Sequence, residues 1–224
     1  MSTSITKTGI LIADGVGVGE NLIINSNAAE FGDSYDSTHH WINWANATDR
    51  SIENVDGKRW FHCKSPTSDK YGGFIQNSSI DEVEFKPDTD YTVSATFFSS
   101  AECNCRFWLH MQSSEGGGNI SRPARNVVVT SIPTRHSFTF NSGHHSTYTI
   151  DKFRLMMGPA YTTEGIDVYF TDVKLEEGVI LTPWTPSVHD DLYVGSELGF
   201  DEGSFEGNAR IASGYMQARE FYED

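Results

Sequence analysis

The sequence has few basic residues, no long apolar run and no extended helical periodicity. Its 224 residues contain 16 Lys and Arg against 31 Asp and Glu, which gives a net charge of −15. A chain this acidic repels phosphate backbones, so nucleic acid is not an expected partner. No apolar run approaches the ~20 residues of a membrane-spanning helix, so membrane insertion is not expected either.

Cysteine is scarce as well. The three cysteines are Cys63, Cys103 and Cys105, and an odd number without a secretory signal argues against a disulfide framework. The first twenty residues carry a single Lys and place Gly and Asp inside their only apolar stretch, which is not the pattern of a signal peptide. We therefore expect synthesis in a cytoplasm and three reduced thiols.

Signatures of common enzymes are also missing. The sequence contains neither a G-x-S-x-G elbow nor an H-E-x-x-H motif. Glycoside hydrolysis uses two neighbouring carboxylates, and no acid stands out in an apolar strand, Asp167 and Asp172 coming nearest. Gly15–Gly19 imitates a phosphate loop but lacks the following Lys-Ser/Thr pair. The chain is expected to be no enzyme and to need no cofactor.

Alternation of apolar and polar residues dominates what is present, and it predicts half-buried strands. Polar, Gly-rich turn clusters separate the runs, among them 86–89, 113–119 and 157–160. Many short strands with such turns favour an all-β fold, an antiparallel sandwich. The residues expected in its core are Tyr91, Val93, Phe97, Phe107, Leu109, Phe138, Phe140, Phe153 and Leu155.

Amino-acid composition and residue pattern divide the chain into three regions. Residues 1–20 form a small, Gly-rich N-terminal attachment segment, and residues 21–187 hold all five Trp and the strand pattern. Residues 188–224 form an acidic C-terminal tail that still alternates around 209–222. Thirty-seven residues are too few for a core of their own, so the tail is assigned to assembly or docking.

Three segments carry a resemblance to a known family. Asn21–Asn27 reads NLIINSN, Val168–Gly178 reads VYFTDVKLEEG, and Thr182–Pro186 reads TPWTP. Together with the central strand at 90–100 they resemble the jelly-roll carbohydrate-binding modules of bacteriophage tail, baseplate and fibre proteins. In that family the chain opens like NLLxNSxF and closes with D-x-x-L-E-x-G followed by W-x-P. The resemblance implies a jelly-roll sandwich over residues 21–187 whose first strand lies near its last.

Two predicted strands each place an aromatic ring and an imidazole on one face. Sugars offer apolar C–H faces that stack on rings and hydroxyls that need fixed donors, so these strands could form one sugar platform. The candidate ligand-binding residues are Trp60, His62, Arg106, Trp108, His110 and Arg154, with Trp41 and Trp44 from the 28–50 segment. The alternative is that Trp41 and Trp60 are plugs beneath that segment. We expect Trp108 to share an accessible surface with Trp60, His62, Arg106, His110 or Arg154.

The resemblance also implies a structural Ca²⁺ where the first and last strands meet. Calcium takes six to eight oxygen ligands, and the candidates in the matching segments are Asn27, Glu30, Asp33 and Asp172. The alternative is that these are solvated surface groups of an acidic protein.

The resemblance implies that the chain is a non-catalytic virion protein, and we expect it to bind a host-surface glycan and other virion proteins. The expected assembly is a homo-oligomer, a trimer organised by the termini, because Ile211–Tyr222 alternates like a strand that must pair. The rival hypothesis is a structural virion adaptor or capsid decoration protein that binds no sugar. A third class, the accessory module of a carbohydrate-active enzyme, would need a catalytic domain that the 224 residues do not contain.

Overall fold

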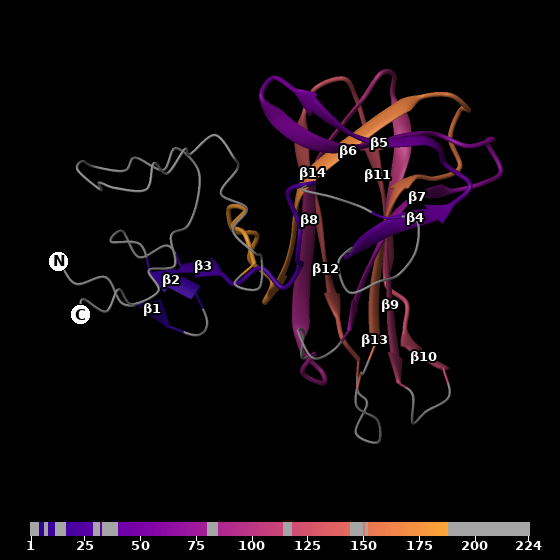
Figure 1. The fold of residues 1–224 in the computed structure, drawn as a ribbon. Coiled ribbons are helices and arrows are strands. Elements are labelled where there is room, and N and C mark those ends of the chain that lie inside the picture. The colour runs from indigo at the N-terminus through magenta and orange to yellow at the C-terminus, as the bar shows by residue number, and fades with distance from the viewer. Residues whose placement is uncertain are drawn as a thin grey trace, which may run out of the picture.

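The computed structural model describes residues 5–6, 9–11, 17–28, 32, 40–79, 85–113, 118–143, 150 and 152–187. Every regular element in these ranges is a β-strand, and two antiparallel sheets pack face to face (Figure 1). A separate three-stranded sheet precedes them, formed by β1 (Ile5–Thr6), β2 (Gly9–Leu11) and β3 (Gly17–Gly19). The described ranges contain no helix long and apolar enough to cross a membrane.

The first large sheet, here the β9 sheet, has the order β10-β9-β13-β7-β4, with β11 also paired to β9. Its strands are β4 (Trp41–Ala45), β7 (Gly72–Ser79), β9 (Cys103–Ser113), β10 (Gly118–Ser121), β11 (Ala124–Val129) and β13 (Lys152–Pro159). The second, the β8 sheet, has the order β12-β8-β14-β6-β5. Its strands are β5 (Thr48–Val55), β6 (Lys58–Lys64), β8 (Asp90–Ser99), β12 (Thr134–Asn141) and β14 (Asp167–Glu177). The fold is the predicted jelly-roll β-sandwich.

The core lies between the two sheets, where the alternation predicts it. Of the nine residues expected there, all are buried except Phe138, which is half-buried on the edge strand β12. Rings from opposite sheets meet in the core: the Phe97 and Phe107 centroids lie 5.4 Å apart and those of Phe61 and Phe74 lie 5.0 Å apart. Side chains of this size dominate the hydrophobic stabilisation of a sandwich.

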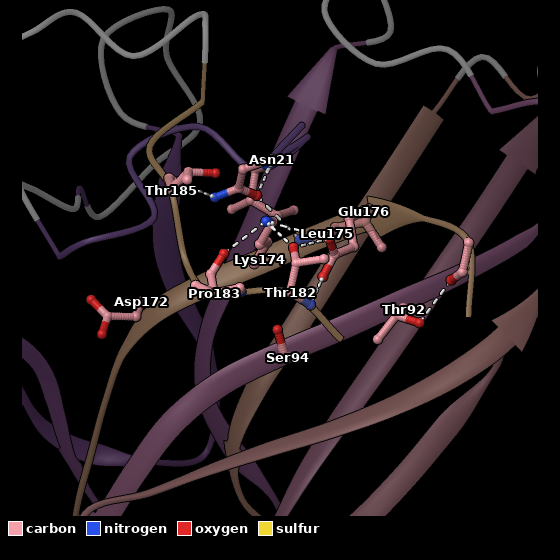
Figure 2. A network of polar contacts seen from close by, with 12 residues as sticks. Asn21, Thr92, Ser94, Asp172, Lys174, Leu175, Glu176, Thr182, Pro183 and Thr185 are labelled. Atoms are coloured by element: carbon pink, nitrogen blue, oxygen red, sulfur yellow. Dashed lines mark hydrogen bonds and ion pairs between the residues drawn. The ribbon is translucent and has the colours of Figure 1, made fainter. Parts of the chain in front are cut away.

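Asn21 joins the start of the sandwich to its last strand, as Figure 2 shows. Its side-chain nitrogen donates to the carbonyls of Val173 at 3.0 Å and Thr185 at 2.9 Å. Its side-chain oxygen accepts from the backbone N–H groups of Ile23 at 3.0 Å and Leu175 at 3.1 Å. Asn21 is buried, so these contacts replace the water that its amide would otherwise require. The first segment therefore lies beside β14, as the resemblance implies.

The closing W-x-P motif is held by the same segment. The indole N–H of Trp184 donates to the hydroxyl of Ser26 at 3.0 Å, and that hydroxyl also accepts from the Asn21 side chain at 3.1 Å. One buried serine thus links the opening and closing motifs, which lie about 160 residues apart in sequence.

A buried ion pair lies on β14 beneath the closing segment. Lys174 and Glu176 project from the same side of the strand and are 0% and 1% exposed, with 3.3 Å between nitrogen and oxygen. The Lys174 ammonium also donates to the hydroxyl of Thr182 at 2.6 Å and to the carbonyl of Pro183 at 2.9 Å (Figure 2). Glu176 accepts from both the backbone N–H and the hydroxyl of Thr182. Burial lowers the pKa of Lys174, and the Glu176 carboxylate opposes that effect.

One sequence prediction about the fold is wrong, and others concern residues that the structure does not describe. The turn predicted at 157–160 is wrong, because β13 continues through Pro159 in register with β9. The acidic tail at 188–224, including Ile211–Tyr222, lies outside the described residues, and so does much of the segment 1–20. The domain boundaries and the trimer therefore stay predictions.

Candidate functional site

The outer face of the β9 sheet carries an aromatic and basic row along β9. Phe107, Leu109 and Met111 have no exposed surface and point into the core. The intervening Arg106, Trp108 and His110 are half-buried on the opposite side of the strand. This is the arrangement that strict alternation predicts for a strand covered on one side only.

Apolar side chains continue the row across the sheet. The backbone register places Trp108 opposite Met156, Met156 opposite Ile75, and Ile75 opposite Ile42. Ile42, Ile75 and Met156 form a hydrophobic cluster apart from the main core, with Trp44 and Trp108 packed against it. A sheet face with one core behind it usually presents polar residues outward, so this second cluster marks the face as a candidate binding surface.

Two glycines allow the tryptophans to meet over the sheet. Trp44 on β4 and Trp108 on β9 belong to strands separated by β7 and β13, a spacing of about 14 Å. Their ring centroids are nevertheless 6.0 Å apart. Gly73 and Gly158 lie between them with positive φ angles of 144° and 150°, and a methyl group on either would overlap the backbone of the other's strand. Because these two glycines have no side chains, the rings of Trp44 and Trp108 can approach each other above them.

Tyr71 and Tyr161 extend the ring cluster. The Trp44 and Tyr71 rings stack at 5.0 Å and 25°, and Tyr71 meets Trp108 edge-on at 5.5 Å. Tyr161, whose side chain is 46% exposed, meets Tyr71 edge-on at 5.7 Å. We call the surface formed by Trp44, Tyr71, Trp108 and Tyr161 the aromatic face. Rings in this arrangement can receive the apolar side of a flat ligand.

Basic groups border the aromatic face. The Arg106 guanidinium lies 4.8 Å from the Trp108 ring centroid, and the His110 ring lies 4.7 Å from it. Burial lowers the pKa of His110, and the charges of Arg122 and Arg154 lower it further. In the register Arg154 lies opposite His110. Arg106 Nε and His110 Nε2 are buried atoms for which the described part of the chain provides no hydrogen-bond partner.

Trp60 and His62 lie elsewhere, so the expectation of one platform built by both strands is wrong. They are on β6 in the β8 sheet and are 5% and 6% exposed. The Trp60 ring packs edge-on against Phe98 at 4.8 Å. His62 lies between two carboxylates, with Nδ1 at 2.9 Å from Glu53 and Nε2 at 2.9 Å from Asp167. Alternation assigns a side chain to one face of its own strand, but it does not say which sheet the strand joins.

Trp41 is a core residue and is not available to a ligand. It has no exposed surface, its ring packs 4.9 Å from Phe61, and its indole N–H donates to the carbonyl of Ile24 at 3.2 Å. The alternative of a structural plug is the correct one for Trp41. The neighbouring Trp44 occupies the outer side of the same strand because it is an odd number of positions away.

The four candidate calcium ligands are not gathered in the described part of the chain. Asn27 is exposed, and the Asp172 carboxylate pairs with Lys58. Glu30 and Asp33 lie outside the described residues. Among the residues that are described, no three of His, Cys, Asp and Glu form a group that could hold a metal ion. The calcium site stays a prediction.

A concave region away from the aromatic face lies between β11 and β12. It is open to solvent, has a volume of about 490 Å³ and is lined by Pro123, Ala124, Arg125, Ser137, Phe138, Thr139 and Phe140. Its polar lining offers few rings for stacking, so the aromatic face is the better candidate for a ligand.

Sequence reasoning missed Tyr71, Tyr161 and the glycine pair. Tyr71 and Tyr161 flank strand ends and have no alternating pattern around them. Gly72-Gly73 and Gly158 were a usable signal, because glycine inside a strand often marks a close approach of backbones.

When the chain is compared with known proteins, the similarity found is to the folds of solved structures. No family model matches the chain, and no curated protein matches it. Solved structures do match. The CBM22-1 xylan-binding domain from Paenibacillus barcinonensis Xyn10C is 10% identical, with a TM-score of 0.45, 66% of this chain and 91% of that domain covered. A family 16 carbohydrate-binding module is 18% identical, with a TM-score of 0.43, 69% of this chain and 99% of that module covered.

An arabinose-bound GH51 α-L-arabinofuranosidase is 13% identical, with a TM-score of 0.50, 73% of this chain and 27% of that enzyme covered. At these identities the likeness concerns the jelly-roll sandwich and nothing beyond it.

Proposed function

We propose that the chain is a non-catalytic carbohydrate-binding protein whose site is the aromatic face. One observation carries the proposal: Trp44, Tyr71 and Trp108, from three separate segments, are brought into mutual contact on the outside of a complete sandwich. Their rings are not needed to fill the main core, which lies on the other side of the sheet. The fold shared with carbohydrate-binding modules is consistent with this role.

Binding would combine stacking with directed hydrogen bonds. The apolar C–H side of a pyranose would lie on exposed ring surface such as that of Tyr161, while Arg106 and His110 supply polar groups for hydroxyls. Each contact is weak, so useful affinity for a surface would come from several copies acting together.

Binding without hydrolysis fits the residues on this face. Hydrolysis of a glycosidic bond uses a pair of carboxylates across the bond. The six strands of the β9 sheet contain no Asp or Glu at all, whereas rings, guanidinium groups and an imidazole are present. These groups hold a sugar but do not supply the acid and nucleophile of that reaction.

We further propose that this module acts on a phage virion as a tail, baseplate or fibre component, in a homotrimer, and attaches the particle to a host-surface glycan. Support comes from the opening and closing motifs of the sequence, which meet in space through Asn21, Ser26 and Trp184. The rival is a virion adaptor or decoration protein that uses the same sandwich without binding sugar.

A glycan-array screen of the full-length chain tests the binding function. We expect at least one class of glycan to bind, and Trp108→Ala to weaken that binding by about 1–3 kcal/mol. Tyr169→Ala is the matched control, because Tyr169 is a half-buried ring on the outer face of the β8 sheet. A folded chain that binds no glycan, or equal losses in both variants, would contradict the proposal and favour the adaptor.

A further inference from the structure

We propose that the aromatic face binds an acidic carbohydrate, one that carries carboxylate, sulfate or phosphate groups. This inference rests on the proposed function and names the class of its ligand. It begins with the distribution of charge between the two sheets. The strands of the β9 sheet contain no acid; their bases Arg106 and Arg154 lie on the side of Trp108, whereas Arg125 is paired with the core residue Phe107 and lies on the other side.

The strands of the β8 sheet contrast with this. Acids and bases are mixed there and nearly balance: the acids are Asp49, Glu53, Asp90, Asp167, Asp172, Glu176 and Glu177, and the bases are Arg50, Lys58, Arg59, Lys64, Arg135 and Lys174. In a chain with 31 acids and 16 bases, an acid-free sheet is a local reversal of the overall charge. A negatively charged ligand would be attracted to this sheet.

The ion pairs of individual bases point the same way. Lys58, Lys64 and Lys174, all in the β8 sheet, form ion pairs with Asp172, Asp49 and Glu176. Arg106 has no such carboxylate among the residues that the structure describes, and neither has Arg122 in the turn before β11. The Nε atom of Arg106 is buried and has no hydrogen-bond partner among the described residues. A buried donor without a partner costs free energy, so a ligand that accepts its hydrogen bond would be favoured.

The position of Arg106 suits an anionic group. Its guanidinium is held against the Trp108 ring at 4.8 Å, which restricts it before any ligand arrives. Its cross-strand neighbour on β13 is Gly158, which has no side chain to fill the space beside it. A planar guanidinium with free donors recognises carboxylate, sulfate or phosphate oxygens in pairs.

The surroundings of His110 also indicate that this region is electropositive. The two charges that act on its imidazole are those of Arg122 and Arg154, and both disfavour protonation. With a lowered pKa the ring is neutral at pH 7, so it can present Nε2 as a hydrogen-bonding group beside these cations. A neutral sugar would use the rings alone, whereas an acidic sugar would also pair with Arg106.

Paired polymers that differ only in charge test this inference on the full-length chain. Dextran sulfate is compared with dextran, and polygalacturonate with its fully methyl-esterified form. At about 0.1 M NaCl we expect the charged member of at least one pair to bind about tenfold or more tightly than its neutral counterpart, and the gap to shrink near 0.5 M NaCl. A gap for dextran sulfate alone identifies a sulfate-like or phosphate-like ligand, and a gap for polygalacturonate identifies a carboxylate.

Two charge-removing variants locate the effect. Arg106→Gln is expected to lower affinity for the charged polymer about tenfold. Arg122→Gln is expected to lower this affinity as well, and it provides an independent test if Arg106→Gln perturbs the fold. Arg59→Gln is the control, since Arg59 is an exposed base on β6 in the other sheet.

Equal affinity for charged and neutral polymers would overturn the inference. The same holds if Arg59→Gln loses as much affinity as Arg106→Gln, because the effect would then be one of total charge. Binding to neutral polymers that Trp108→Ala abolishes would overturn only the acidic specificity and leave the proposed function intact. Failure to bind any of the four polymers or any arrayed glycan would overturn both.

Discussion

The side-chain oxygen of Asn21 accepts a hydrogen bond from the backbone N–H of Leu175 at 3.1 Å, across 154 positions of sequence. Because Asn21 also contacts Ile23, Val173 and Thr185, one buried amide satisfies backbone groups from three segments.

We expect Asn21→Ala to lower the free energy of unfolding by about 2–4 kcal/mol, since several buried backbone groups lose their partner at once. Urea denaturation of the full chain measures this. Asn27→Ala is the control, because Asn27 is exposed in the same segment and should change stability by less than about 0.5 kcal/mol. Similar losses in the two variants would contradict the role assigned to Asn21.

Glu176→Gln should be more harmful than Glu177→Gln, although the two residues are adjacent. Glu176 is the buried partner of Lys174, and removing one charge of a buried pair costs about 3–5 kcal/mol. Glu177 pairs with Lys86 at the surface, where both side chains are at least half exposed and the pair is worth about 0–1 kcal/mol. Denaturant midpoints of the two variants decide the order, and a reversed order would show that the Lys174 pair does not stabilise the fold.

Gly73→Ala should disturb both stability and the aromatic face. The added methyl would overlap the carbonyl of Met157, and the positive φ angle adds strain, so we expect a loss of about 2–5 kcal/mol. Gly143→Ala is the control, because Gly143 has a positive φ angle but open space around it, and it should cost about 1 kcal/mol. Near-ultraviolet circular dichroism should change only for Gly73→Ala, as Trp44 and Trp108 separate.

Trp60→Phe should leave glycan binding unchanged. Trp60 lies in the β8 sheet, and its buried indole nitrogen has no hydrogen-bond partner among the described residues. Phe keeps a ring at this position but fills less volume, so we expect the free energy of unfolding to fall by about 1–3 kcal/mol while the protein still folds. Glycan affinity and thermal unfolding of this variant test the assignment, and a loss of binding would return the site to the β8 sheet.

The three thiols should differ in reactivity. Burial raises the pKa of Cys63 to about 12 and that of Cys105 well above its usual range, whereas a hydrogen bond with Cys105 lowers the pKa of Cys103. In the native protein Cys63 should therefore react with a disulfide reagent at pH 8 about 10³-fold more slowly than in denaturant, and Cys103 should react first. Mass spectrometry of the labelled peptides gives the order.

The same pKa shift fixes a direction for stability at high pH. The folded-state pKa of Cys63 is above its ordinary value of 9.0, so its contribution to stability is fully present below pH 9. That contribution is lost as pH rises from 9 through about 12, because the unfolded thiol ionises first. Cys63→Ala should weaken this alkaline decline, and an unchanged slope would contradict it.

Alternation predicted the face of each side chain within its own strand, and hence most of the core and the row Arg106, Trp108, His110. It could not predict which strands are neighbours, because the two-residue period is the same in both sheets. Trp60 and His62 therefore repeat the pattern of β9 while lying on the opposite side of the sandwich.

Other parts of the site depend on distances that no sequence pattern encodes. Trp44 and Trp108 touch only because Gly73 and Gly158 face each other across β7 and β13. Trp41 and Trp44 look equivalent in sequence, and only the burial of one side of β4 separates a core plug from a surface ring.

The contact between Asn21 and Thr185 also has a mechanical consequence. Because it holds the two ends of the sandwich together, the chain enters and leaves the sandwich at one place. Tension applied between the preceding and following segments would act on this small clamp of hydrogen bonds before it reached the sheets. The aromatic face, built on β4, β7, β9 and β13, would keep its shape under a load that pulls on both flanks.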